Sequence, residues 1–218
     1  MLEIRYVWEW PVRLTHWVNA FCIVMLSITG LYIGNPVLTS SETTAYYMGW
    51  ARFVHFSFAY LFLVSIIARF IWMFLGNHHA SWKAFIPWIS ASGRKNFVQM
   101  VRYYTFTGKK ITYEVGHNPV AATAYAGVYA LFLVQVFSGF ALYGQVAPGG
   151  FWDSSVGWLL PLVGNQALRL THHLVMWLLL AFVINHVYSG WLMDVKERNG
   201  TMSGIFGGCR YIEPEDLS

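Results

Sequence analysis

Four long apolar stretches constrain this chain more than any other feature. They cover about residues 14–33, 50–75, 121–146 and 168–193. Each is long enough for the roughly 20 consecutive apolar residues with which one α-helix crosses a bilayer. Charged residues make up 11% of the chain, well below the roughly 25% of an ordinary soluble domain. The sequence therefore predicts an all-α fold, an integral membrane four-helix bundle forming a single domain over residues 1–218.

The residues before the first stretch do not look like a cleaved leader. They read MLEIRYVWEWPVR and contain acidic residues, arginines and Pro11. A secretory signal peptide has a short basic segment and a cleavage site instead, so we expect the first span to remain in the mature protein. The two cysteines, Cys22 and Cys209, form neither a CxxC nor a CxxCH motif. Any haem is therefore expected to be held by coordination, without thioether bonds.

Lysines and arginines are distributed unevenly around the spans. Eleven lie in the N-terminal arm, the 76–120 segment and the tail, whereas Arg52 and Arg169 lie at the opposite ends of the spans. Positive residues in short loops favour the cytoplasmic side. We therefore expect both termini and the long loop between helices 2 and 3 to be cytoplasmic, in a bacterial inner-membrane protein. The net charge of +4 then reflects topology and contact with membrane lipid, and indicates no nucleic-acid binding.

Histidines within or beside the spans are the candidate functional residues, because an ionisable side chain inside a membrane is costly and usually functional. Those on the fourth span are His172, His173 and His186. His172 and His186 are 14 residues apart. That separation is about 21 Å along a helix and returns to nearly the same face. His173 lies about 140° around the helix from His186, so we favour His172.

The expected topology places the histidines at two depths. His16 begins the first span and His186 lies toward the end of the fourth, so both are expected near the cytoplasm. His55 and His172 lie near the starts of the second and fourth spans, which face the periplasm. Imidazole is a normal axial ligand of haem iron. The sequence therefore predicts two b-type haems, bound by His16 and His186 on the cytoplasmic side and by His55 and His172 on the periplasmic side.

Arginines precede three of these histidines by three residues, in RLTH at 13–16, RFVH at 52–55 and RLTH at 169–172. Residues three apart share one face of a helix. Arg52 and Arg169 are therefore candidates to bind the propionates of the periplasmic haem, and Arg13 is a further candidate. The alternative is that these arginines are anchors whose long side chains reach the membrane surface.

Other chemistry also uses membrane histidines. Zinc requires four ligands within one shell, which pairs of histidines at two depths provide poorly. A proton relay through histidines is also conceivable. A haem-free, histidine-based metal or proton transporter is therefore an alternative from a different functional class.

Short motifs are spread over nearly the whole chain: PVRLTHW, YMGWARFVHF, GNHH, VGHNPVA, SGFALYG, HHLVMW, FVINHVY and a tail close to STMxxGYR at Gly200 to Arg210. Together they resemble the cytochrome b subunit of membrane-bound, uptake NiFe-hydrogenases. The resemblance implies the same four haem ligands, His16, His55, His172 and His186. Thr15 and Thr171 depart from the family pattern, in which a tryptophan often precedes the ligand.

The resemblance further implies an anchor for a periplasmic hydrogenase with a small (iron-sulfur) and a large subunit. Electrons would pass from the small subunit through two haems to a quinone, either ubiquinone or menaquinone. The chain alone is not expected to be catalytic. The nearest alternative is the di-haem cytochrome b of a formate dehydrogenase or thiosulfate reductase.

The GHNP turn before the third span is a candidate quinone site. Quinone carbonyls need hydrogen-bond donors and, on reduction, protons from the cytoplasm, so the site is expected near the cytoplasmic haem. His117 and Asn118 lie at that depth. The turn is also similar in position to an asparagine turn in the related formate dehydrogenase membrane subunits. The alternative is that Asn118 and Pro119 only cap the third helix.

Overall fold

The computed structural model describes residues 3–37, 46–108, 116, 118–197 and 199–212. The chain divides into two compact units, Trp8–Ser81 and Met1–Val7 with Trp82–Ser218. Four helices in the described residues are long and apolar enough to cross a membrane, which confirms the predicted four-span fold. They are α1 (Trp10–Gly34), α2 (Tyr47–Leu75), α5 (Pro119–Gly144) and α8 (Asn165–Glu197). The single-domain organisation stays a prediction.

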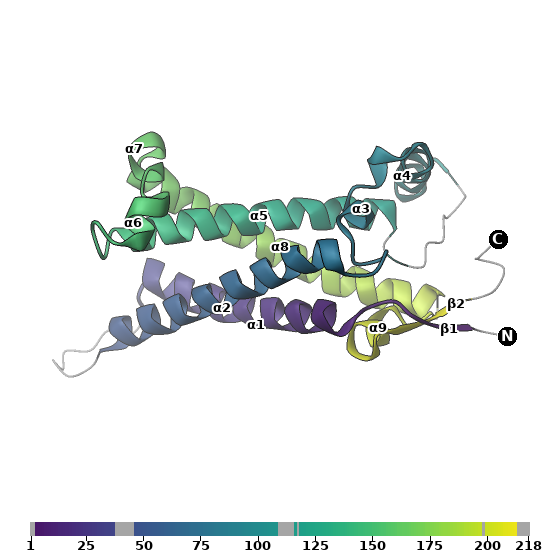
Figure 1. Ribbon diagram of the computed structural model, residues 1–218, viewed down its shortest axis with the longest axis horizontal. Helices are drawn as coiled ribbons and strands as arrows, with labels where there is room; N and C mark the ends of the chain where they lie inside the picture. The colour runs from purple at the N-terminus through teal and green to yellow at the C-terminus, as the bar shows by residue number, and fades with distance from the viewer. Residues whose placement is uncertain (1–2, 38–45, 109–115, 117, 198, 213–218) are drawn as a thin grey trace. The chain divides into compact units, whose positions relative to one another are not determined.

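The unit of residues 8–81 is an antiparallel pair of helices, α1 and α2 (Figure 1). Helix α1 has Pro11 in its first turn, where the missing N–H of proline costs nothing. Just before it, the Glu9 carboxylate accepts hydrogen bonds from Trp72 Nε1 at 2.9 Å and from the Asn77 backbone N–H at 2.8 Å. This single side chain therefore joins the start of α1 to the end of α2.

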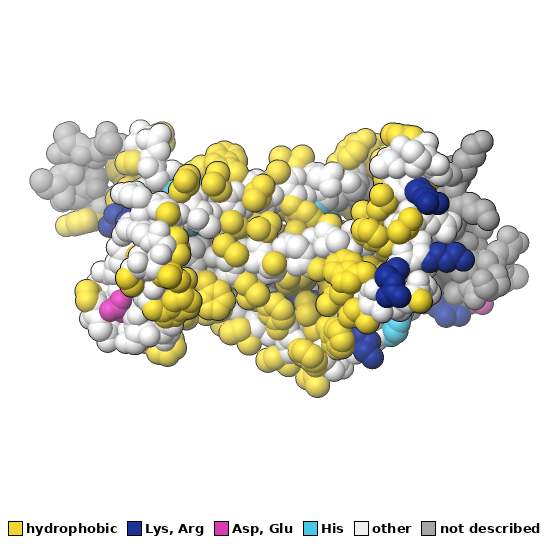
Figure 2. All heavy atoms as spheres, turned by 90° about the horizontal axis from the view of Figure 1, so that it is seen from above, with side chains coloured by type: hydrophobic (Ala, Val, Ile, Leu, Met, Phe, Trp, Pro, Cys, Tyr) yellow, Lys and Arg dark blue, Asp and Glu magenta, His cyan; other side chains and the backbone are white. Residues whose placement is uncertain are grey.

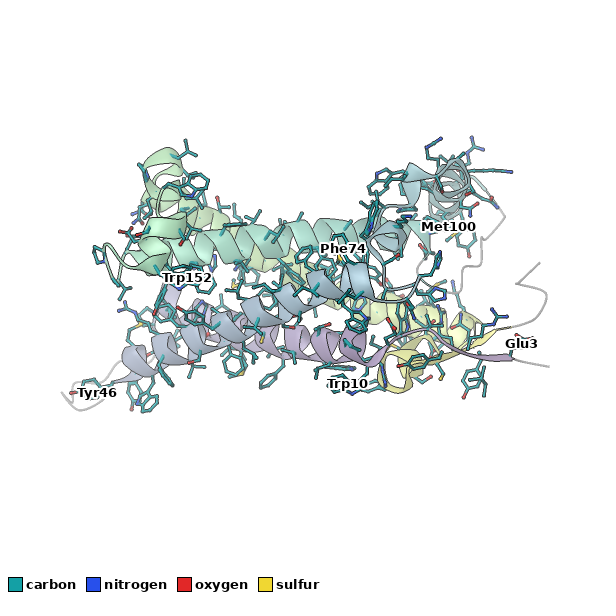
Figure 3. All side chains as sticks on the ribbon, in the orientation of Figure 1. Glu3, Trp10, Tyr46, Phe74, Met100 and Trp152 are labelled. Atoms are coloured by element: carbon teal, nitrogen blue, oxygen red, sulfur yellow. The ribbon has the colours of Figure 1, made fainter. Side chains whose placement is uncertain are left out.

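In the other unit, α5 and α8 pack against each other, and the short helices α6 (Phe151–Val156) and α7 (Leu159–Val163) connect them. The ring of Trp152 in α6, which is labelled in Figure 3, stacks on Phe140 of α5 with 3.9 Å between ring centroids. A Cβ atom on Gly144 would lie 2.9 Å from the Asp153 backbone nitrogen, so glycine permits this close approach. The contact helps to explain why α5 ends at Gly144 and not at the predicted residue 146.

The same unit contains smaller elements. They are α3 (Trp82–Phe85), a 3-10 turn η1 (Pro87–Ile89), α4 (Ala91–Tyr104), α9 (Thr201–Gly207), β1 (Glu3–Tyr6) and β2 (Cys209–Ile212). Strands β1 and β2 pair antiparallel, with Glu3 opposite Ile212 and Tyr6 opposite Cys209. This ribbon, which is not among the predicted elements, brings the two ends of the unit together.

The spanning helices expose apolar side chains along their lengths, as a lipid-facing surface requires. Phe53, Val64, Leu178 and Ile184 are each more than half exposed. On the face drawn in Figure 2, hydrophobic side chains cover the helices, and Lys and Arg side chains lie toward their ends. This surface suits a hydrocarbon environment, where every backbone group of a span is satisfied within its own helix. The sidedness of the termini stays a prediction.

Candidate functional site

The two neighbouring histidines of α8 make different contacts. The Nδ1 atom of His172 lies 2.8 Å from the Ser138 hydroxyl of α5. The Nδ1 atom of His173 lies 2.9 Å from the carbonyl oxygen of Arg169, one turn earlier in its own helix. His172 is therefore the one of the two that contacts α5, and its role as a haem ligand stays a prediction.

His186 meets α5 as well. Its Nδ1 atom lies 3.4 Å from the Tyr125 hydroxyl, and its ring stacks on Phe182 with 5.4 Å between centroids. His172 and His186 thus share the face of α8 that packs on α5, at points far apart along the helix. The structure places them as the 14-residue spacing predicted.

In the unit of residues 8–81, His55 and His16 lie at opposite ends of the helix pair. His55 Nδ1 is 2.9 Å from the Thr29 hydroxyl, near the end of α1. His16 is near the start of α1, where the preceding carbonyl of Thr15 accepts a hydrogen bond from Ser65 at 3.4 Å. Within this unit the two histidines are therefore not brought together, and their assignment to two membrane depths stays a prediction.

The hydrogen bonds around His55 and His172 suit these two histidines as iron ligands. The Thr29 hydroxyl is 2.7 Å from the Met25 carbonyl oxygen, and the Ser138 hydroxyl is 2.6 Å from that of Val134. A carbonyl oxygen can only accept a hydrogen bond, so each hydroxyl donates its single proton to that oxygen. The same hydroxyl must then accept a hydrogen bond from the imidazole Nδ1–H. That tautomer puts the lone pair on Nε2, the form in which imidazole binds a metal.

A glycine also lies against each of these two rings. A Cβ atom on Gly30 would lie 3.3 Å from His55 Cε1, and one on Gly139 would lie 3.0 Å from His172 Cε1. The Gln135 amide nitrogen lies 3.3 Å from His172 Nε2, so a metal at that nitrogen would take the place of this amide. Among the residues that the structure describes, no three His, Cys, Asp or Glu side chains gather as a metal cluster.

The three candidate propionate arginines differ in exposure. Arg52 is exposed near the start of α2, and Arg13 is half-buried in α1. Arg169 is exposed, and its Nε atom donates to Asn165 Oδ1 at 2.7 Å. Their roles at a haem stay predictions.

The candidate quinone turn is partly described. His117 lies outside the described residues. Asn118 is the N-cap of α5: its Oδ1 accepts from the Ala121 backbone N–H at 2.9 Å, ahead of Pro119. Its amide nitrogen donates to the Tyr104 hydroxyl of α4 at 3.3 Å. The capping alternative therefore holds for the oxygen, whereas the quinone role stays a prediction that rests on the amide group.

Three polar residues make contacts in the structure that were not predicted from the sequence. Arg69 is only 3% exposed within α2 and donates to the Ala80 carbonyl oxygen at 3.0 Å. Its signal was its charge inside the second apolar stretch. Gln135 gave a similar signal in the third. Arg210 gave none, because its contacts depend on how the tail folds. It donates to the Gly116 carbonyl at 2.9 Å, 94 residues away in the chain, and to the Thr201 hydroxyl at 2.7 Å.

Comparison with known proteins places this geometry in a family. The family model described as prokaryotic cytochrome b561 matches residues 7–208. The chain belongs to this family. As a b-type cytochrome with four spanning helices, it is a multi-pass integral protein of the bacterial inner membrane and carries haem b.

Relatives of this cytochrome b align over almost their full lengths. A "Probable Ni/Fe-hydrogenase B-type cytochrome subunit" of Cupriavidus necator is 39% identical, covering 96% of this chain and 88% of the relative. A protein of the same name from Azotobacter chroococcum is 37% identical, with 96% and 90% covered. A "Probable Ni/Fe-hydrogenase 1 B-type cytochrome subunit" of Escherichia coli K12 is 32% identical, with 94% and 90% covered. The resemblance seen in the motifs is confirmed.

Proposed function

We propose that this cytochrome b anchors a periplasmic Ni/Fe-hydrogenase and transfers its electrons, through two b-type haems, to membrane quinone. The observation that carries the proposal is the placement of His172 and His186. Both lie on the face of α8 that packs on α5, near opposite ends of one span. The names of the relatives add the hydrogenase.

The proposed ligands are those selected by depth: His55 with His172 for the outer haem, and His16 with His186 for the inner haem. When bound, each haem supplies a one-electron carrier whose filled axial positions limit rearrangement. The chain's own part is to hold each imidazole at a fixed depth and angle. Thr29 and Ser138 support the two outer ligands through their hydroxyls.

The outer haem is proposed to face the periplasm and the hydrogenase small subunit, which in turn carries the large subunit. This sidedness rests on the excess of lysines and arginines in the arm, the 76–120 segment and the tail. The same positive charges contact anionic lipid headgroups on the cytoplasmic side. Exposed Arg52 and Arg169 lie at the other side, where they would pair with the carboxylates of the outer haem.

Quinone reduction is proposed at the cytoplasmic side, near Asn118 and His117. Oxidation of one hydrogen molecule leaves two protons outside, and a quinone takes up two electrons and two protons inside. Each charge carried across then stores about 2.3 kcal/mol per 100 mV of membrane potential. Asn118 supports this site with an amide that already donates to the Tyr104 hydroxyl.

Two alternatives predict different behaviour. A cytochrome b for formate dehydrogenase or thiosulfate reductase would show the same haem bands and respond to a different donor. A haem-free metal or proton transporter would show no low-spin haem bands, contrary to the cytochrome b family membership.

Hydrogen-dependent haem reduction tests the proposal. Membranes containing this chain with its hydrogenase subunits are reduced under hydrogen, and the haem bands and quinol are followed in time. We expect both haems to be reduced and quinol to form, with neither occurring when this chain is deleted. Haem reduction by formate but not by hydrogen would contradict the hydrogenase assignment.

A further inference from the structure

A hydroxyl followed by a glycine lies against one histidine in each unit. On α1 the pair is Thr29 and Gly30, which meets His55 of α2. On α5 it is Ser138 and Gly139, which meets His172 of α8. The local arrangement is thus repeated in two helix pairs that differ in sequence. A repeated device at the two proposed ligands of one haem points to a shared role.

The hydrogen-bond directions are the same in both copies. Each hydroxyl is buried, Thr29 at 9% and Ser138 at 2% exposure. Each lies 2.6 to 2.7 Å from a carbonyl oxygen one turn earlier and 2.8 to 2.9 Å from an imidazole Nδ1. Because the hydroxyl proton goes to the carbonyl, the imidazole must donate its Nδ1–H. A hydroxyl that is itself a donor becomes a better acceptor.

The glycines bring each ring against the helix backbone. A side chain on Gly30 or Gly139 would crowd the Cε1 atom, which sits between the two ring nitrogens. The hydroxyl is hydrogen-bonded to Nδ1 of the imidazole, and the neighbouring glycine leaves room for the Cε1 edge of the ring. Ring position and tautomer are therefore determined together.

The two proposed inner ligands have different surroundings. His186 Nδ1 lies 3.4 Å from the Tyr125 phenol, a longer contact to a group that has its own proton to donate. His16 has an edge-to-face contact with Trp17 at 5.1 Å between centroids. Within the described part of the chain, the matched hydroxyl and glycine pair is found against His55 and His172.

We propose that Thr29 and Ser138 are positioning residues that hold both axial imidazoles of the outer haem as Nδ1–H donors and raise their basicity equally. This inference rests on the proposed ligation. A hydrogen bond accepted from Nδ1–H makes Nε2 a stronger ligand. A stronger ligand favours ferric over ferrous iron, so the two hydroxyls lower the midpoint potential of the outer haem and leave the inner one unchanged.

The test is a redox titration of the optical and EPR spectra of the whole cytochrome in Thr29→Val, Ser138→Ala and the double variant. Valine keeps the shape of threonine without the hydroxyl. We expect each single variant to shift the potential of one haem upward, and the double variant to shift it further. Thr29→Ser restores the hydroxyl and is expected to restore the potential and the EPR signal.

Thr123→Val is the matched control on α5. Its hydroxyl is also bonded to a carbonyl one turn earlier, that of Pro119 at 2.9 Å. We expect this variant to leave both potentials unchanged. An equal shift in Thr123→Val, or no shift in either Thr29→Val or Ser138→Ala, would overturn the positioning role. Loss of the outer haem in Thr29→Val with retention in Thr29→Ser would support it, whereas loss in both would overturn it.

Histidine variants separate this inference from the proposed function. If His55→Ala and His172→Ala each lose the same haem while the hydroxyl variants leave the midpoint potentials unchanged, the proposed ligands are supported and the positioning role is wrong. If both histidine variants retain two haems, the ligation itself is wrong, and the positioning role falls with it.

Discussion

Asn118 offers two groups to its surroundings. Its side-chain oxygen caps α5 by accepting from Ala121, and its amide donates to Tyr104. A leucine here would remove both, and loss of a cap alone costs about 0.5–2 kcal/mol. A serine keeps the capping oxygen and removes the amide donor. Serine therefore separates quinone chemistry from helix stability.

We expect Asn118→Ser to slow hydrogen-dependent quinone reduction severalfold while leaving both haem spectra and the melting temperature near those of the parent. The reason is that only the amide donor is lost. Quinol formation under hydrogen is the measurement, with Asn118→Leu expected to slow it as well and also to lower stability. Unchanged quinone turnover in both variants would remove Asn118 from the quinone site.

Some properties of single residues could be predicted from the sequence, and others could not. Helix phase separated His172 from His173, because 100° per residue is a property of the helix alone. It could not find the Ser138 hydroxyl as partner, since that depends on the register of α5 against α8. For Asn118 the sequence pattern allowed two roles, capping and quinone binding, and the hydrogen bond from the Ala121 N–H confirms the cap without excluding the other role.

At the scale of helices, glycines on α5 differ in what they face. A Cβ on Gly139 would meet His172 at 3.0 Å, whereas Gly127 has no atom within 4 Å of such a position. We expect Gly139→Val to displace His172 and lose one haem, at a cost of about 1–3 kcal/mol in stability. Gly127→Val is expected to retain both haems. Haem content per polypeptide is the measurement, and equal haem content in the two variants would contradict this packing.

Glu9 joins two helices, α1 and α2, so its removal should destabilise the pair. In Glu9→Ala the half-buried Trp72 and Asn77 N–H groups lose their acceptor, and the penalty approaches the lower end of the roughly 1–3 kcal/mol that a fully buried donor costs. We expect a lower melting temperature, measured by thermal unfolding in detergent. Glu3→Ala is the control, because its exposed pair with Arg5 at 3.3 Å is worth at most about 1 kcal/mol. Equal melting of the two variants would show that Glu9 does not hold the helices.

The spanning helices could be predicted because an apolar run of sufficient length has few alternatives in lipid. Each observed helix begins two to four residues before its apolar stretch, since first turns include residues such as Pro11, Arg13 and Pro119. The ribbon of β1 and β2 could not be predicted. Its four-residue strands are about two hundred residues apart, and neither is long enough to give a strand pattern by itself.

At the scale of the whole molecule, the proposed function depends on haems at two depths and on one side facing the hydrogenase. Both rest on the distribution of charge and histidine along the chain. The family membership supplies haem b and the membrane, and the relatives' names supply the hydrogenase. The number of haems is the quantity on which the transmembrane path depends, because a single haem at one face would not carry electrons across about 30 Å of hydrocarbon.

Redox titration of the optical spectrum in His16→Ala, His55→Ala, His172→Ala and His186→Ala therefore tests the central claim most directly. We expect two haems in the parent and one in each variant. His55→Ala and His172→Ala should lose the same titration step, and His16→Ala and His186→Ala the other, while His173→Ala keeps both. A parent with one haem, or a His173 variant that loses a step while the His172 variant does not, would contradict the two-haem arrangement.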